Sequence, residues 1–212
     1  MLNEAESLSK DLFELYLKKQ DEIRQRLTEF KSIEESDVFY ELCYCLCTPQ
    51  SKAENAYRVV EQLKAKNFIE SEIDVCEILR NKNHYIRFHF QKTQNLLKAK
   101  SNYPNIKRII ESNSTTAFQK RDQLAESVRG FGLKEASHFL RNIGIFGPAI
   151  LDRHTLKHLA LCNVYHSEGK SISKTQYIDI ENRWLIFCDK ISIPIEEMDL
   201  LFWSAETGVI LK

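Results

Sequence analysis

Lys134 and Asp152 each stand at the expected start of a helix and carry the groups that covalent catalysis uses. Lys134 follows the turn Gly130-Phe131-Gly132, whose glycines permit positive φ angles and close approach of the backbone to a ligand. A neutral amine can attack a carbon that is losing a leaving group, and a carboxylate can assist the attack. The pair is therefore a candidate for nucleophilic catalysis.

The turn before Lys134 is also suited to an anion, because the first amides of a helix point outward at its positive end. A phosphate group of DNA would be a natural ligand. Each feature has a plainer explanation: glycines serve packing at helix corners, most lysines are solvated, and an aspartate before a helix is usually only a cap. It is the combination of Gly130, Gly132, Lys134 and Asp152 that departs from these explanations.

Composition limits the kind of nucleic-acid site that is expected. Thirty basic and thirty acidic residues cancel in a chain of 212 residues, which excludes a polycation of the histone kind. The segment 80–110 is locally basic and has no acidic residue; its basic residues are Arg80, Lys82, Arg87, Lys92, Lys98, Lys100, Lys107 and Arg108. A solvated helix face is the usual explanation of such a run. The interleaved Tyr85, Phe88, Phe90 and Tyr103 favour nucleic-acid binding.

Helical periodicity extends over almost the whole chain, and strand-like alternation is brief. Apolar residues between 8 and 27 mark one face of a long first helix, and those between 38 and 46 mark a second. The other predicted helices span residues 52–66, 73–80, 91–101, 106–111, 117–128, 134–143, 152–162, 174–189 and 195–207. Ser36, Asp152 and Pro194 are expected at helix starts, and Gly144 and Gly208 just after helix ends. The sequence therefore predicts an all-α protein of two lobes with a cleft between them.

Cysteine spacing argues against a metal site. No pair of cysteines has the C-x-x-C spacing, so neither a zinc ribbon nor a redox pair is indicated, and the six cysteines are expected to be buried and reduced. The chain opens without a signal peptide, and no apolar run approaches about 20 residues. We therefore expect an intracellular protein with no membrane contact, in the cytoplasm of a prokaryote.

Two motifs resemble the helix-hairpin-helix DNA glycosylase superfamily: residues 133–142, Leu-Lys-Glu-Ala-Ser-His-Phe-Leu-Arg-Asn, and residues 149–154, Ala-Ile-Leu-Asp-Arg-His. More narrowly, the chain is similar to the type 2 8-oxoguanine DNA glycosylase/lyases, best known from archaea and some bacteria. The similarity continues in residues 42–50, in Arg87-Phe88, and in the tail 203–212, which favours the type 2 branch.

The resemblance implies an all-α glycosylase fold with the active site in the cleft between two lobes, as one catalytic unit over residues 1–212. Its hairpin would lie at about 123–144. Lys134 matches the nucleophile that displaces the damaged base at C1′ of the sugar, and Asp152 matches the carboxylate that assists lysine deprotonation and stabilises oxocarbenium-like charge. A Schiff base would then lead to strand cleavage by β-elimination.

Further residues match positions that contact DNA in the family. A flipped base needs aromatic faces and polar edges, and Phe88, Trp203 and the α-carboxylate of Lys212 match those roles. Phe90 makes the first assignment ambiguous, and Phe88 is preferred because it follows Arg87. The positions expected to contact the duplex are Gly130, Gly132, Gln50 and Arg153.

The resemblance also sets expectations about partners. The expected substrate is double-stranded DNA that contains oxidised guanine, acted on by a monomer without a cofactor or a catalytic metal. Cys162 and Cys188 are too few for the iron-sulfur cluster of other superfamily members, and the hairpin carbonyls are a candidate site for a monovalent cation. Two alternatives stay open: the same chemistry on another damaged base, and a hairpin module that binds DNA without catalysis.

Overall fold

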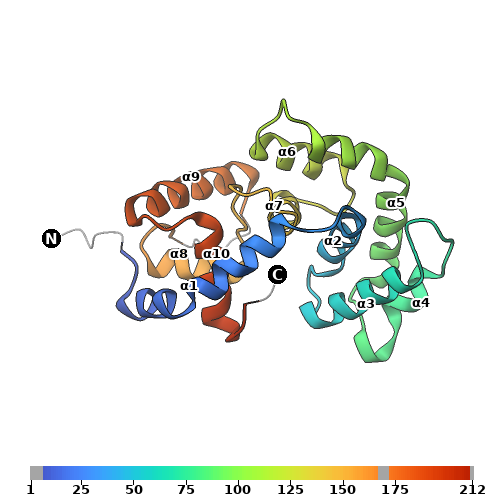
Figure 1. Cartoon of the computed structure of the whole chain (residues 1–212), viewed down its shortest axis with the longest axis horizontal. Helices are drawn as coiled ribbons and strands as arrows, with labels where there is room; N and C mark the ends of the chain where they lie inside the picture. Colours follow the sequence, from blue (N-terminus) through green and yellow to red (C-terminus); the bar gives the residue numbers. More distant parts are fainter. Residues whose placement is uncertain (1–6, 167–171, 211–212) are drawn as a thin grey trace. The chain divides into compact units, whose positions relative to one another are not determined.

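In the computed structural model, which describes residues 7–166 and 172–210, all regular secondary structure is helical (Figure 1). This confirms the all-α prediction. The chain divides into two compact units: the described part of Met1–Ser32 and Gly144–Lys212, here the terminal unit, and Ile33–Ile143, here the hairpin unit. Within the described residues, no helix has the length and apolar character needed to cross a bilayer.

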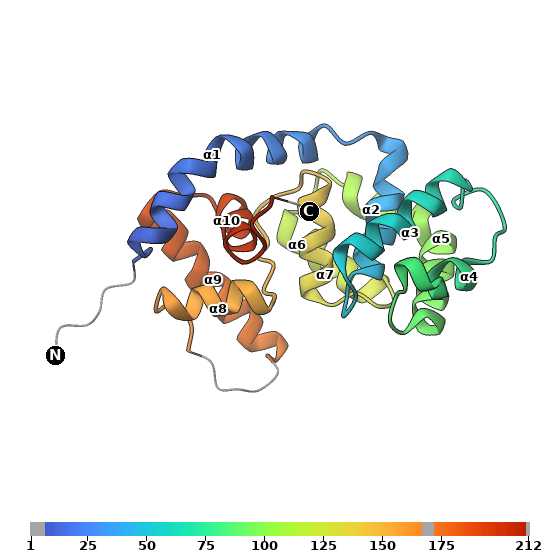
Figure 2. The ribbon, with the colours of Figure 1, turned by 90° about the horizontal axis from the view of Figure 1, so that it is seen from below.

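The terminal unit is built around its last helix, α10, which packs against α1, α8 and α9 (Figure 2). The unit consists of α1 (Lys10–Lys31), α8 (Arg153–Leu161), α9 (Lys174–Ile191) and α10 (Ile195–Thr207). Burial on most sides of α10 explains its largely apolar sequence. Its Phe202 stacks on the fully buried Trp184 of α9, with ring centroids 6.0 Å apart.

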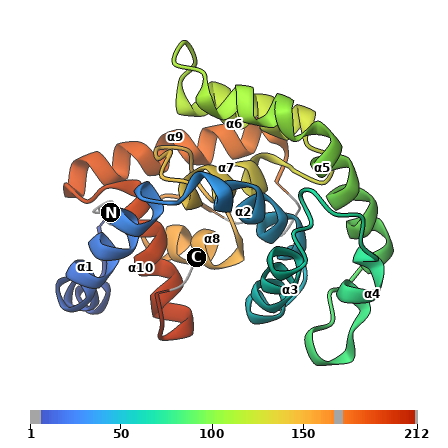
Figure 3. The same ribbon diagram turned by 45° about the vertical axis from the view of Figure 1, so that its right-hand side comes forward.

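The hairpin unit has α2 at its centre, in contact with α3, α5 and α7 (Figure 3). Its helices are α2 (Glu35–Cys47), α3 (Ala53–Ala65), α4 (Val75–Arg80), the 3-10 helix η1 (Lys82–His84), α5 (His89–Glu111), α6 (Ala117–Ser127) and α7 (Leu133–Asn142). Every residue of 39–47 is buried, including three cysteines. Burial raises the pKa of the Cys43 thiol well above its usual value and that of Cys47 to about 12, so both stay protonated.

The structure corrects one predicted break. Residues 91–101 and 106–111 were expected to form two helices, but α5 runs without interruption through Pro104. A proline inside a helix loses a backbone hydrogen bond and costs about 3 kcal/mol. Packing opposes that cost, since the ring of the preceding Tyr103 lies edge-on to Phe39 at 5.0 Å between centroids.

Helix ends follow the predictions with one exception. Ser36 was expected to precede a helix, but α2 begins at Glu35 and Ser36 lies inside its first turn. Acidic side chains in that turn favour the earlier start, because they face the positive end of the helix. Gly144 follows α7 with a φ of +76°, and a Cβ atom there would come within 2.7 Å of the Lys31 Cα. The close approach of α1 requires glycine at this position.

Candidate active site

The hairpin between α6 and α7 is closed by a hydrogen bond of 3.0 Å from the Phe131 amide to the Val128 carbonyl. Phe131 is buried beneath the turn, with its ring 6.1 Å from that of Phe139. Gly130 has a φ of +97°, and a Cβ atom there would overlap the side chain of Asn95 on α5. Packing inside the hairpin unit thus demands glycine at 130, independently of any ligand.

Lys134 is the second residue of α7, and its side chain is 32% exposed. Its Nζ forms an ion pair of 2.8 Å with Oε1 of Glu135. The other oxygen of that carboxylate accepts a hydrogen bond of 3.2 Å from the Gly132 amide. One carboxylate therefore caps α7 and neutralises the candidate nucleophile. This role of Glu135 was not predicted, although a glutamate three residues after a helix cap is a known capping signal in a sequence.

The later turns of α7 make structural contacts. The ring of His138 lies edge-on to that of Tyr44 at 5.9 Å, and the Asn142 side chain donates a buried hydrogen bond of 3.1 Å to Glu41. These contacts bind α7 to α2 through residues of the glycosylase-like motif. They fix the helix on which Lys134 stands.

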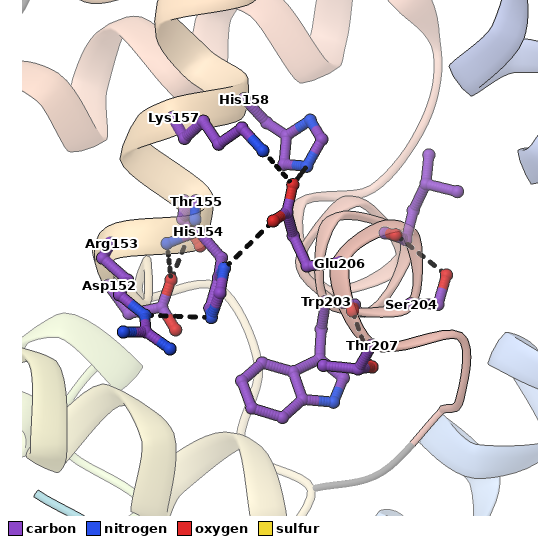
Figure 4. Close-up of polar contacts among 11 residues, drawn as sticks. Asp152, Arg153, His154, Thr155, Lys157, His158, Trp203, Ser204, Glu206 and Thr207 are labelled. Carbon is purple, nitrogen blue, oxygen red and sulfur yellow. Dashed lines mark hydrogen bonds and ion pairs between the residues drawn. The ribbon is translucent and has the colours of Figure 1, made fainter. Parts of the chain in front are cut away.

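Asp152 is the N-cap of α8, as predicted. Its Oδ1 accepts hydrogen bonds of 2.8 Å from the amides of both His154 and Thr155 (Figure 4). The second carboxylate oxygen takes no part in the cap. The two hydrogen bonds hold the carboxylate in one orientation. Asp152 is thus a fixed carboxylate at the start of a helix.

A polar cluster connects the first turns of α8 to α10 (Figure 4). The Arg153 Nε donates to the His154 Nε2 over 3.1 Å, and the His154 Nδ1 lies 3.5 Å from a Glu206 oxygen. A histidine that accepts from arginine at one nitrogen must carry its proton on the other, which faces Glu206. The His154 ring also stands perpendicular to that of Trp203, with centroids 5.6 Å apart.

Glu206 is the centre of this cluster. Its Oε1 accepts a hydrogen bond of 2.7 Å from Lys157 and lies 3.0 Å from the Nε2 of His158. The Lys157 hydrogen bond is the main reason that the pKa of Glu206 is lowered. Burial lowers the pKa of His158, although Glu206 opposes that shift. Glu206 was not predicted as a site residue, because it belongs to no motif in the sequence.

Trp203, the candidate stacking residue, is half-buried on α10. Its indole Nε1 is buried and has no hydrogen-bond partner among residues 7–166 and 172–210. The ring therefore keeps a hydrogen-bond donor that no described residue uses. Lys212, the other candidate from the tail, lies outside the described residues.

Phe88 and Phe90 differ in environment. Phe88 precedes α5 with a φ of +58° and is 49% exposed, and the Arg87 guanidinium lies 5.4 Å from its ring centroid. Phe90, in the first turn of α5, packs on the ring of His89 at 4.2 Å. Gln50 has a φ of +55° and is exposed after α2. Phe88 and Gln50 thus both occupy backbone conformations that non-glycine residues rarely adopt.

The basic segment 80–110 is not a uniform surface patch. Lys100 forms an ion pair of 3.1 Å with Glu72, and Lys107 pairs with Glu35. Lys92 is 5% exposed, and its ammonium binds backbone carbonyls. Within the described part of the chain, no group of three or more His, Cys, Asp or Glu residues could hold a metal ion.

The candidate residues are divided between the two units. Gly130, Gly132, Lys134, Gln50 and Phe88 lie in the hairpin unit, and Asp152, Arg153 and Trp203 lie in the terminal unit. Each unit contains one helix start that a carboxylate caps: Glu135 caps α7, and Asp152 caps α8.

Known proteins share this architecture. The chain matches solved 8-oxoguanine DNA glycosylases, among them the glycosylase/lyase of Methanocaldococcus jannaschii in complex with a 15mer DNA containing 8-oxoguanine. That structure has a TM-score of 0.84 and 32% identity, covering 96% of this chain and 98% of the other. The 8-oxoguanine DNA glycosylase of Thermotoga maritima has a TM-score of 0.83 and 27% identity, covering 96% of this chain and 97% of the other.

Sequence relatives agree. An 8-oxoguanine DNA glycosylase/AP lyase of Fusobacterium nucleatum is 34% identical over 95% of this chain and 96% of its own length. One from Methanocaldococcus jannaschii is also 34% identical, over 91% of this chain and 92% of its own. The model of the family described as 8-oxoguanine DNA glycosylase matches residues 23–193. The helix-hairpin-helix fold and these matches together show that the chain belongs to the 8-oxoguanine DNA glycosylase family.

Proposed function

We propose that this chain removes 8-oxoguanine from double-stranded DNA and then cleaves the strand at the resulting abasic site. The observation that carries the proposal is the position of Lys134. Its partly exposed amine stands at the start of α7, directly after the glycine hairpin, in a chain whose relatives bear the name 8-oxoguanine DNA glycosylase/AP lyase.

In the first step, the neutral amine of Lys134 attacks C1′ of the damaged nucleotide, and the bond between C1′ and the base breaks. The base leaves with the bonding electrons and takes up a proton. Asp152 is suited to accept the proton that the ammonium loses and to stabilise positive charge on the sugar. Its two cap hydrogen bonds both use Oδ1, so the second carboxylate oxygen is left for this role.

The second step follows from the covalent bond between lysine and sugar. The sugar ring opens as its oxygen leaves C1′, which gives a Schiff base between C1′ and Nζ of Lys134. The imine acidifies the C2′ proton, and removal of that proton expels the 3′ phosphate by β-elimination. The electrons and protons balance within lysine, sugar and water, so we propose a reaction that needs no cofactor.

Recognition is assigned to other side chains of the two units. A glycosylase must take the damaged nucleotide out of the base stack. We propose that Phe88 and Trp203 stack on the flipped base. We propose that Gln50 fills the space that this base leaves in the duplex. Arg153 and the hairpin amides of Gly130 and Gly132 are assigned to backbone phosphates.

We propose that a monomer acts on oxidised guanine in duplex DNA, and that the hairpin carbonyls bind a monovalent cation.

At the hairpin, a phosphate of the DNA backbone would replace the Glu135 carboxylate, which accepts a hydrogen bond from the Gly132 amide in the free protein. Binding of DNA would thereby also release Lys134 from its ion pair.

Borohydride trapping tests the proposal. A duplex with one 8-oxoguanine should become covalently attached to the wild-type protein, because borohydride reduces the Schiff base to a stable amine. Lys134→Gln should abolish trapping and excision. Lys98→Gln is the matched control, since Lys98 is an exposed lysine on α5. Trapping that survives in Lys134→Gln would overturn the assignment of the nucleophile.

A panel of duplexes separates the alternatives. Faster excision of another oxidised or alkylated base than of 8-oxoguanine would keep the chemistry and change the lesion. Salt-sensitive binding to DNA without any product would identify a binding module instead. Either result would overturn the proposed function.

A further inference from the structure

Lys92 is a lysine whose charged end is buried. It lies in the first turns of α5 and is 5% exposed. Its Nζ donates to the Cys47 carbonyl at 2.7 Å, the Pro49 carbonyl at 2.6 Å and the Ser51 hydroxyl at 3.2 Å. An ammonium has three protons, so each has an acceptor. Burying a cation against neutral oxygens is costly, which suggests that the arrangement serves more than packing.

The acceptors of Lys92 define the end of α2 and the turn that follows it. The last carbonyls of a helix have no partner within the helix and attract a cation. Lys92 supplies this cation at Cys47 and binds again at Pro49, immediately before Gln50. The positive φ of Gln50, +55°, is therefore held from the buried side by the ammonium.

The same network reaches Phe88. The Ser51 hydroxyl that accepts from Lys92 also accepts from the Arg87 amide at 3.1 Å. The Lys92 amide donates to the Phe88 carbonyl at 2.9 Å, so α5 begins against Phe88 itself. Lys92 thus connects the two exposed residues, Gln50 and Phe88, whose positive φ angles need external support.

We propose that Lys92 is a positioning residue: its buried ammonium sets Gln50 and Phe88 in the conformations that admit a flipped base. This inference rests on the proposed function, because it gives both side chains a task in base flipping. Lys92 has no direct part in the chemistry at C1′. Its loss should therefore impair the capture of a stacked base more than reaction at a site whose base is already missing.

Charges around Lys92 make the device sensitive to pH. Burial lowers the pKa of the Lys92 ammonium to about 8. The groups that face it are Cys47 on α2, Arg87 before α5, and Lys134 and Glu135 on α7; Cys47 and Glu135 oppose the shift, and the two cations add to it. Above about pH 8 the amine keeps two protons for three acceptors, so the network loses a bond.

The test compares two reactions of each variant in single-turnover experiments. One is excision of 8-oxoguanine from a duplex, and the other is borohydride trapping on a duplex with a preformed abasic site. Lys92→Met should slow excision by about tenfold or more, the effect of losing hydrogen bonds to a charged group, and trapping much less. Lys100→Met is the control, because Lys100 is also on α5 and binds the Ser71 carbonyl at 2.9 Å.

The measured quantity that tests the inference is the ratio of the excision rate to the trapping rate. In the wild type, the ratio of excision to trapping should fall as pH rises through about 8, whereas in Lys92→Met it should be low and independent of pH. Equal losses in both reactions, or a wild-type ratio that does not change with pH, would overturn the inference.

A milder variant covers the case in which Lys92→Met does not fold. Ser51→Ala keeps the lysine and removes the acceptor shared with the Arg87 amide, and it should lower the ratio in the same direction. An unchanged ratio in Ser51→Ala would overturn this inference and leave the proposed function in place. A wild-type protein that leaves 8-oxoguanine in place would overturn the proposed function and this inference with it.

Discussion

The first turns of α7 and α8 are both capped by a carboxylate, but the capping residue has a different relation to the candidate catalytic group in each. Both helices begin with free amides that a carboxylate caps: Glu135 reaches back to Gly132 at α7, and Asp152 accepts from two amides at α8. At α8 the capping carboxylate is itself the candidate catalytic group. At α7 it is paired with the candidate nucleophile, Lys134, at 2.8 Å.

The difference concerns the side chain that each cap holds. The α8 cap orients Asp152 itself, and orientation is what its proposed role requires. The α7 cap instead holds the Lys134 side chain in an ion pair. In the free protein Asp152 is therefore already oriented for its proposed role, whereas Lys134 must first separate from Glu135.

The largest effect is expected at α8, where Asp152→Asn keeps the oxygen that caps the helix and removes the negative charge. Asparagine caps helices about as well as aspartate, so unfolding should change by less than about 1 kcal/mol. Base excision should slow by about 10²- to 10⁴-fold, the range for loss of an acid-base group. Thermal unfolding and single-turnover excision measure the two effects.

Asp152→Ala is the matched comparison, since it removes both functions. It should lose a similar factor in rate and a further ~1 kcal/mol of stability. An Asp152→Asn protein that excises at the wild-type rate would show that Asp152 is only a cap.

A smaller effect of opposite sign is expected at α7. Glu135→Gln keeps an oxygen that can accept from the Gly132 amide and removes the charge that holds the ammonium. Because the ion pair no longer holds the Lys134 side chain, excision at neutral pH should become about two- to fivefold faster. Glu126→Gln, an exposed change on α6, is the control. Slower excision in Glu135→Gln would mean that the carboxylate positions Lys134 for attack.

The smallest effect concerns the pH dependence of the α8 cluster, which has no counterpart at α7. Burial lowers the pKa of His158 from 6.5, so the unfolded chain takes up the proton at a higher pH than the folded one. The terminal unit should therefore lose stability as pH falls below about 6.5. In His158→Gln this loss between pH 7 and 5 should shrink, by about 2–4 °C in melting temperature.

The pH range also separates two groups. The pKa of Glu206 is lowered from 4.5, so its contribution is lost only below that value, outside the interval measured. A melting temperature of His158→Gln that falls with acid as steeply as in the wild type would assign the effect to another group.

Local features of this protein were predictable from sequence. The Asp152 cap, the glycines after α7 and α10, and the positions of most helices follow from rules that act over a few residues. The break expected at residues 101–106 was wrong for the same reason: the rule for proline is local, while the packing of Tyr103 on Phe39 is not.

Charge pairing was far less predictable. Within the basic segment 80–110, the sequence does not distinguish Lys92, which is buried, from Arg80, which is exposed. Glu206 gains its place only because α8 and α10 pack together. The free energy of an ionic group depends on its solvent exposure and on charges that are distant in sequence.

The sequence by itself determined the helices, the family and the identities of Lys134 and Asp152 as candidate groups, because residue type and short spacing carry that information. Only the tertiary structure decided that Lys134 is paired with Glu135, that Trp203 stands against His154, and that a buried Lys92 supports Gln50 and Phe88. These outcomes depend on burial and on contacts between distant segments, and those exist only once the helices have packed.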